Sequence, residues 1–151
     1  MLRVLIYEYF TGGGLAESPT FPSVLSEGYA MLNSLLRDFS HNAGCETITV
    51  LDRRVAEDIP HIAANRMITV SSSAQVKRIF RSTISEVDAI LVVAPETEGT
   101  LYKLTQLVED TGGATLLGSS SNAVKVASNK QSITRLAKSL GVAVPEMVSF
   151  S

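Results

Sequence analysis

Residues 89–99, with the sequence AILVVAPETEG, contain the clearest fold signal in the chain. The first six are continuously apolar, which is typical of a strand buried on both faces in a parallel sheet covered by helices. Ligands of open parallel sheets bind outside the carboxyl ends of the strands. Glu96, Thr97 and Glu98, which follow this strand, are therefore candidates for the substrate side of a site. The alternative is that the two acids begin a helix and are stabilised by its dipole.

Outward from this strand, strand-like and helix-like segments alternate along the chain. Helical stripes begin near residue 22, after the serine run 71–73 and after residue 99, and further apolar runs occupy 3–9, 46–51, 67–70 and 114–117. Such alternation predicts an α/β fold with right-handed crossovers. We expect a Rossmann-like or flavodoxin-like open, mostly parallel sheet with helices on both faces.

A run of three glycines follows the first predicted strand, which contains Glu8. Gly12, Gly13 and Gly14 permit close approach of the backbone to a ligand, and with Glu8 they form the second part of the candidate substrate side. A flexible loop is the alternative interpretation. The G-x-G-x-x-G fingerprint is missing and no helix is predicted directly after the run, which disfavours a dinucleotide-binding oxidoreductase. Residues 52–54, after the second strand, are interpreted as a charged loop.

Composition excludes several classes of function. The 151 residues carry a net charge of −2 and no basic run, so nucleic acid is not an expected partner. Cys45 is the only cysteine, which excludes an internal disulfide and a cysteine metal cluster, and His41 and His61 lack metal-ligand spacing. No metal site is predicted. The chain shows neither a signal peptide nor an apolar run of the ~18 residues that a membrane span needs, so we expect a cytoplasmic protein without a membrane partner.

Residues 118–145 predict two helices that meet at Ser128-Asn129-Lys130. The second helix carries an apolar stripe of the width of a core-facing helix, formed by Ile133, Leu136, Ala137 and Leu140. Ser128 and Gln131 have capping-box spacing, which places Lys130 at the second helical position. A lysine there can join the free N–H groups of the first turn in holding a phosphate. The alternative is a solvated surface lysine.

The joint at Ser128-Asn129-Lys130, followed by LGVAVP at residues 140–145, resembles the junction between the pre-ATP-grasp domain and the ATP-grasp fold of carboxylate–amine ligases. Residues 96–98 with their flanks (APETEGTLYKLTQLVE) and the early EYFTGGG are similar to the archaeal-type tyramine–glutamate ligase group. In that superfamily the second helix begins at an Asp-Lys pair, so Asn129 departs from the pattern while Lys130 matches the lysine that reaches the nucleotide phosphates.

The resemblance implies a pre-ATP-grasp α/β domain at residues 1–120 and the start of a truncated ATP-grasp region at 121–151. It implies a parent enzyme that activates a small-molecule carboxylate as an acyl phosphate, with ATP and Mg²⁺, for attack by an amine. The remaining family elements would lie beyond Ser151. We therefore expect this chain alone to be inactive and to bind neither cofactor tightly, and homo-oligomerisation is left open. The alternative is a stand-alone, non-catalytic α/β module that binds a small molecule or mediates assembly.

Overall fold

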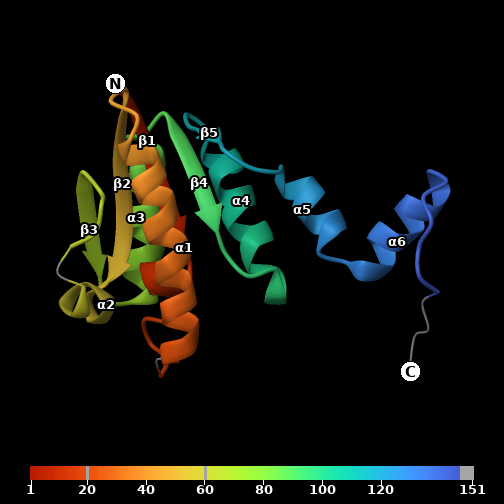
Figure 1. Ribbon diagram of the computed structural model, residues 1–151, viewed down its shortest axis with the longest axis horizontal. Coiled ribbons are helices and arrows are strands. Elements are labelled where there is room, and N and C mark those ends of the chain that lie inside the picture. The colour runs from red at the N-terminus through yellow and green to blue at the C-terminus, as the bar shows by residue number, and fades with distance from the viewer. Residues whose placement is uncertain (20, 60, 147–151) are drawn as a thin grey trace.

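The computed structural model describes residues 1–19, 21–59 and 61–146, and it contains a five-stranded parallel sheet (Figure 1). The strand order is β3-β2-β1-β4-β5, and every pair of neighbours is parallel. The strands are β1 (Leu2–Glu8), β2 (Cys45–Asp52), β3 (Arg66–Val70), β4 (Ala89–Val93) and β5 (Thr115–Leu116). The order reverses between β1 and β4, which is the topological switch point of such a sheet. The predicted α/β class is confirmed.

Helices cover both faces of this sheet (Figure 1). The helix α1 (Pro22–Ser40) and the short α2 (Arg53–Asp58) pack on one face, whereas α3 (Ser73–Ile84) and α4 (Thr100–Thr111) pack on the other. Two further helices, α5 (Ser121–Ala127) and α6 (Lys130–Ser139), follow β5. Pro22 stands at the start of α1, where its missing N–H is tolerated. Ser72 caps α3 by accepting a hydrogen bond from the Gln75 amide, as the serine run predicted.

The core consists of two apolar clusters, one on each face of the sheet. Alternate residues of β1 supply both: Leu5 and Tyr7 face α3, whereas Val4 and Ile6 face α1. All four side chains are almost completely buried. This explains why β1 reads as a continuous apolar run, because a central parallel strand has no solvent-facing side.

Two segments differ from the sequence-based prediction. A π-helical turn, η1 (Phe10–Gly14), follows β1 where an irregular loop was expected. The predicted charged loop at residues 52–54 is wrong, because Asp52 caps α2 through a hydrogen bond from the Arg54 amide and the helix begins at Arg53. Asp52 is almost completely buried. A helix of six residues lacks the repeated apolar stripe that reveals longer helices, which is why the sequence left residues 55–66 ambiguous, with a helical turn as one possibility.

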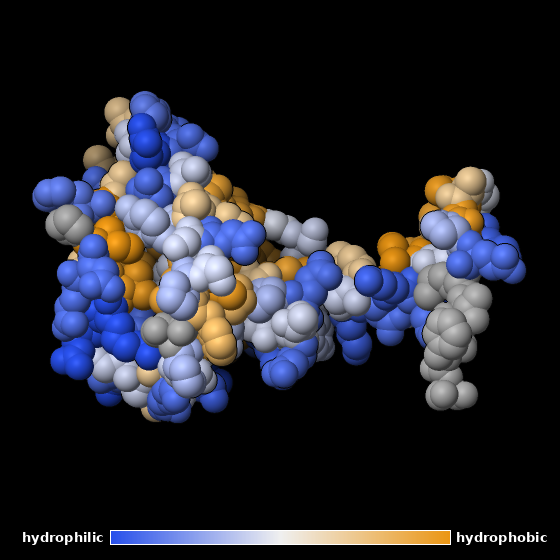
Figure 2. Space-filling view, turned by 60° about the horizontal axis from the view of Figure 1, so that its bottom comes forward, coloured by the Kyte–Doolittle hydropathy of each residue, from blue (hydrophilic) through white to orange (hydrophobic). Residues whose placement is uncertain are grey.

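The helix α6 projects away from the sheet-containing body and is joined to it through α5 (Figures 1 and 2). Asn129, not Ser128, caps α6 by accepting a hydrogen bond from the Ser132 amide, so Lys130 is the first helical residue and the predicted capping box is wrong. The expected core-facing stripe is also exposed: Ile133, Leu136 and Leu140 retain 39%, 46% and 72% of their accessible surface. No residue of α6 is buried.

None of the helices formed by the described residues combines the length and the apolar character that crossing a membrane would require.

Candidate functional site

Glu8 ends β1 and has no exposed surface. Its Oε2 atom accepts hydrogen bonds from the amide and the hydroxyl of Thr11, both at 2.7 Å, and Oε1 accepts from the Phe10 amide at 3.1 Å. Gly28 of α1 packs directly on this carboxylate, because a Cβ built there would lie 2.5 Å from Oε2. The Glu8 carboxylate therefore faces the η1 turn and α1. In this structure it positions the backbone after β1 and does not line a solvent-accessible site.

The glycines of η1 are packed against the body. A Cβ atom would lie 2.5 Å from the Tyr7 ring at Gly12, 2.7 Å from Val70 at Gly13, and 2.4 Å from the Tyr9 ring at Gly14. Gly12 and Gly13 are buried, and Gly13 has φ of +88°, a conformation that favours glycine. The glycines thus allow close approach of the chain to its own core. This role differs from both alternatives that the sequence left open, a flexible loop and a ligand cradle.

Arg54 ties the segment after η1 to the carboxyl end of β2. Its guanidinium donates to the carbonyl oxygens of Leu15 and Ser18 at 2.7 and 3.0 Å, and to both carboxylate oxygens of Asp52. Burial by itself would raise the pKa of Asp52, but the hydrogen bonds and the positive charge of Arg54 outweigh it and hold that pKa below its usual range. Asp52 is consequently a buried carboxylate that stays charged and orients the arginine.

The lowered pKa of Asp52 predicts an acid-sensitive contribution to stability. Because the folded-state pKa lies below the unfolded value of about 4, this contribution is present above that value and is lost as the pH falls through the folded pKa. We expect Asp52→Asn to lower the free energy of unfolding at pH 7 by about 1–3 kcal/mol, and to flatten its decline below about pH 5. Urea denaturation from pH 3 to 7 measures both effects.

The matched control for Asp52 is Glu57→Gln. Glu57 lies on α2, the helix that Asp52 caps, and forms an exposed ion pair with Arg53 at 3.8 Å. Such pairs contribute about 0–1 kcal/mol. If both variants showed the same pH dependence as the parent protein, the role assigned to Asp52 would be wrong.

Glu96, Thr97 and Glu98 are exposed at the carboxyl end of β4. Thr97 and Glu98 belong to a 3-10 turn, η2 (Thr97–Gly99), in which Glu98 has φ of +56°. The Lys103 ammonium donates to the backbone oxygen of Glu98 at 3.0 Å and so fastens this turn to α4. The helix α4 begins only at Thr100 and has no acidic residue in its first turn. Glu98 is thus an acid in the first turn of η2, which runs directly into α4, whereas Glu96 precedes that turn and its side chain forms no capping hydrogen bond.

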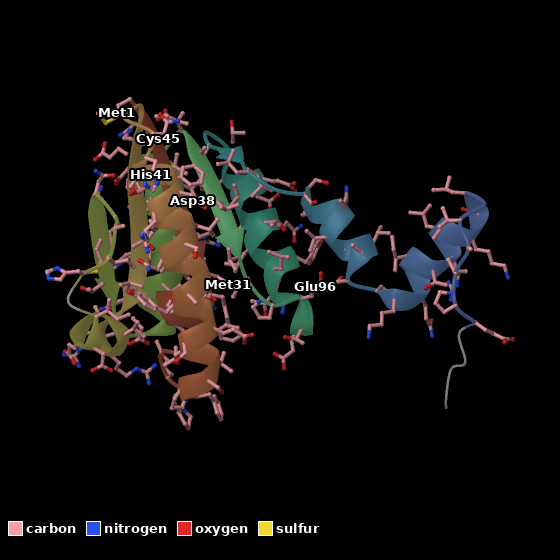
Figure 3. The ribbon with its side chains drawn as sticks, viewed as in Figure 1. Met1, Met31, Asp38, His41, Cys45 and Glu96 are labelled. Carbon is pink, nitrogen blue, oxygen red and sulfur yellow. The ribbon has the colours of Figure 1, made fainter. Side chains whose placement is uncertain are left out.

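A hollow of about 260 Å³ opens beside Glu96, between β4, β5, α4 and α5. Figure 3 shows Glu96 beside the start of α4, on the side of the body where α5 lies. The wall is mostly apolar, and its polar side chains are those of Glu96, Thr105 and Ser119. The apolar side chains in the wall are Val92, Leu101, Leu116, Leu117, Ala123, Val124 and Ala127. The hollow thus lies beside the carboxyl end of β4, on the side of β5 and not at the switch point between β1 and β4.

The far wall of this hollow is the helix α5, which two polar contacts fasten to α4. The Glu109 carboxylate accepts hydrogen bonds from the hydroxyl and the amide of Ser121, and these bonds lower the pKa of Glu109. The Lys125 ammonium lies 5.5 Å from the centre of the Tyr102 ring. Val124 is buried with only 8% of its surface exposed. These contacts make α5 part of the wall even though α6 beyond it stands free of the body.

Three larger hollows have less suitable walls. That of about 760 Å³ is formed mainly by α3, and its wall contains none of the predicted site residues. One of about 850 Å³ lies between α6 and residues 142–146, so its wall adjoins residues outside the described range. Another of about 420 Å³ lies between α1 and α2. Arg54 lines it, but its guanidinium is already hydrogen-bonded to Asp52, Leu15 and Ser18. We therefore take the hollow beside Glu96 as the candidate site.

The predicted site residues fall into three separate places. Glu8 and the glycines lie with η1, which contacts β2, α1 and α3, whereas Glu96 borders the hollow on the β4–β5 side. Across residues 1–19, 21–59 and 61–146, no hydrogen bond or ion pair joins these two groups. Lys130 is exposed at the start of α6. The sequence placed Glu96 correctly at a strand end and predicted the short helix that is α5, but nothing in it indicated that Glu109 fastens this helix to α4.

The donor set for a magnesium ion is also missing from the part of the chain that the structure describes. No group of three or more His, Cys, Asp or Glu side chains there is arranged to hold a metal ion. The described residues therefore do not fit Mg²⁺, and no reaction step is assigned to a metal on this chain.

Known proteins with similar sequences and similar structures show to which family this chain is related. Two curated relatives, the tyramine–L-glutamate ligases of Methanocaldococcus jannaschii and Methanocaldococcus fervens, are each 28% identical, over 95% and 84% of the chain. The chain spans less than half of their lengths, 44% and 42%. An ATP-grasp superfamily protein from Archaeoglobus fulgidus matches in structure with a TM-score of 0.71 at 24% identity, over 92% of this chain and 40% of that one.

A more distant structural neighbour is the pyruvate carboxylase of Rhizobium etli, with a TM-score of 0.62 at 16% identity. The match covers 98% of this chain and 13% of the carboxylase chain. At such identities the structural matches establish the fold. The relationship to ATP-grasp ligases that the sequence motifs suggested is confirmed by the relatives together with a family model. That model, the pre ATP-grasp 3 domain, matches residues 45–124, more than half of the chain. The chain belongs to the pre ATP-grasp 3 domain family.

Proposed function

We propose that this chain is the N-terminal, substrate-side domain of an ATP-dependent carboxylate–amine ligase that works through an acyl phosphate. The observation that carries the proposal is the hollow beside Glu96, at the carboxyl edge of the sheet of a pre-ATP-grasp domain. An open, mostly apolar cavity with few polar groups suits a small organic substrate. The names of the two curated relatives, which join tyramine to L-glutamate, support the carboxylate–amine reaction class.

In the proposed reaction, a carboxylate oxygen of one substrate attacks the γ-phosphorus of ATP and ADP leaves. The amine of the second substrate then attacks the acyl carbon, a C–N bond forms and phosphate departs. Catalysis of phosphoryl transfer consists mainly of positioning and charge stabilisation. The described residues supply an exposed lysine, Lys130, and no magnesium site. For this reason we propose that the chain alone does not ligate, and that it works with a nucleotide-binding half in a cytoplasmic parent protein.

The proposed division of the chain separates the sheet domain, residues 1–120, from the start of the ATP-grasp region, 121–151. The contacts of α5 favour a refinement of that boundary. Because Glu109 and Tyr102 of α4 hold Ser121 and Lys125 of α5, we place α5 with the sheet domain. The boundary then falls at Ser128, between α5 and α6, and Lys130 belongs to the nucleotide side.

The phosphate role of Lys130 is tested in the full-length parent protein. We expect Lys130→Ala to lower kcat/KM for ATP-dependent ligation by about 100-fold, since losing one charged contact to a developing phosphoryl charge has an effect of this order. Release of ADP with both substrates present is the measurement. Lys138→Ala, near the other end of the same helix, is the matched control and is expected to retain activity. Unchanged activity of the Lys130 variant would reduce that residue to a surface lysine.

Titration of the isolated chain with magnesium–ATP tests the remaining part of the proposal. We expect isothermal titration calorimetry to detect no binding with micromolar affinity, because one exposed lysine does not make a nucleotide-binding site. Micromolar affinity would contradict the assignment of ATP binding to another half.

A second candidate function is a stand-alone, non-catalytic module that binds a small molecule or mediates assembly. The lack of a metal-binding group among residues 1–19, 21–59 and 61–146 favours it, since it needs no magnesium. A source gene that ends at Ser151 would support this candidate, whereas a continuation of ~150 or more residues, the size of a further domain, would support the ligase.

A further inference from the structure

We infer that the hollow beside Glu96 binds the amine substrate, as a primary ammonium group carried on a small apolar body. This inference rests on the proposed function and deepens it, because it assigns one of the two substrates to this domain. Three observations support it: the apolar wall, the single carboxylate at the rim, and the absence of a structural task for that carboxylate.

The wall of the hollow is suited to the apolar body of a ligand. Leu101 and Thr105 come from α4, whereas Ala123, Val124 and Ala127 come from α5. The Thr105 hydroxyl donates to carbonyl oxygens of its own helix, those of Leu101 and Tyr102, at 2.9 and 3.0 Å. Its one hydroxyl proton is therefore already engaged within α4. At about 260 Å³ the hollow lies just below the ~300–1,000 Å³ typical of drug-sized ligands, so it fits a smaller molecule.

The rim of the hollow is negatively charged. Glu96 lines it and forms no ion pair among the described residues, whereas Glu98 is not part of the wall. The nearby cations are engaged elsewhere, with Lys103 on the backbone oxygen of Glu98 and Lys125 over the Tyr102 ring. An unpaired carboxylate beside an apolar wall attracts an ammonium group and repels the carboxylate of an acid substrate.

Glu96 has no other task in this structure. It precedes the η2 turn but forms no capping hydrogen bond there, and α4 starts four residues later without an acidic residue in its first turn. Stabilisation of the α4 terminus would require a position in that first turn. The carboxylate is thus free to bind a ligand. The Ser119 hydroxyl, on the segment before α5, is the other polar side chain available at the wall.

The test is a titration of the ¹⁵N-labelled chain with three probes of one shape: 2-phenylethylamine, 2-phenylethanol and 3-phenylpropionate. We expect the amine to shift amide resonances of residues 92–105 and 116–127, with at least tenfold weaker binding of the alcohol and none of the acid. Glu96→Gln is expected to weaken amine binding about tenfold, the loss of one charge-assisted contact. Glu98→Gln, outside the wall, is the matched control and should change it less than twofold.

A second pair of variants tests the hollow independently of the charge. Ala123→Leu places a larger side chain in the wall and should abolish amine binding, whereas Ala74→Leu, on α3, should not. Equal binding of the amine and the acid, or undiminished binding to Glu96→Gln, would overturn the inference.

A lack of any shift at 20 mM amine would overturn the inference as well, but it would leave the ligase proposal standing, with the amine held by the other half. Conversely, amine binding without ATP-dependent ligation by the full-length parent would refute the proposed function and leave the amine site in place.

Discussion

Replacement of Gly13 by alanine is expected to lower the free energy of unfolding by about 3 kcal/mol. Two effects add. A side chain at φ of +88° adopts a left-handed conformation, which is unfavourable by about 1–2 kcal/mol. The new Cβ would also lie 2.7 Å from Val70 and 2.9 Å from Val76, and overpacking of this kind costs about 1–3 kcal/mol.

The chain contains a matched control for Gly13. Gly113 has φ of +92°, nearly the same as Gly13, but no atom lies within 4 Å of the position of its Cβ. Gly113→Ala therefore isolates the backbone effect and should lower stability by only about 1–2 kcal/mol. Urea denaturation followed by circular dichroism gives both values. Equal losses for the two variants would show that η1 is not packed on Val70 and Val76, and would return it to the flexible loop that the sequence also allowed.

The second large effect is expected at the buried carboxylate of Glu8. Glu8→Ala leaves the amides of Phe10 and Thr11 without their acceptor. Since an unsatisfied buried polar group costs about 1–3 kcal/mol, we expect a loss of about 2–4 kcal/mol in the free energy of unfolding. Gly28→Ala should cost about 1–3 kcal/mol, because its methyl group would collide with the Glu8 carboxylate.

A double-mutant cycle separates this collision from a general weakening of α1. Removal of the Glu8 carboxylate leaves space for the methyl group, so the Glu8→Ala, Gly28→Ala variant should be more stable than the sum of the single losses predicts, by at least about 1 kcal/mol. Ser34→Ala, at an exposed position of α1, is a control that should have almost no effect. Additive losses within about 0.5 kcal/mol would contradict the direct packing of Gly28 on Glu8.

The glycine run illustrates how far sequence reasoning reaches. For residues 12–14 the sequence left open a close approach of the backbone to a ligand or a flexible loop, because glycine allows both. The sequence did not indicate which residues lie against these glycines. The neighbouring residues are the chain's own Tyr7, Val70 and Tyr9, and the contact of Gly13 with Val70 joins residues 57 positions apart. A sequence pattern reports local geometry, whereas the identity of a distant neighbour depends on the folded chain.

Glu8 and Glu96 show the same limit of sequence-based prediction for the residues of the candidate site. Both are carboxylates at the end of a parallel strand, and the sequence assigned them the same substrate-side role. The structure buries Glu8 under Gly28 and leaves Glu96 exposed at an apolar hollow. The difference arises from what packs over each strand end: η1 and α1 cover the end of β1, whereas a hollow remains beside the end of β4, between α4 and α5.

The amino-acid sequence by itself determined the α/β class, the position of the five strands and the candidate carboxylates at their ends, because these follow from local periodicity and composition. Only the tertiary structure decided which carboxylate is buried, that α5 is fastened to α4, and that the apolar stripe of α6 is exposed. The physical reason is that hydrophobic periodicity specifies which face of an element is apolar, but not which surface will cover it.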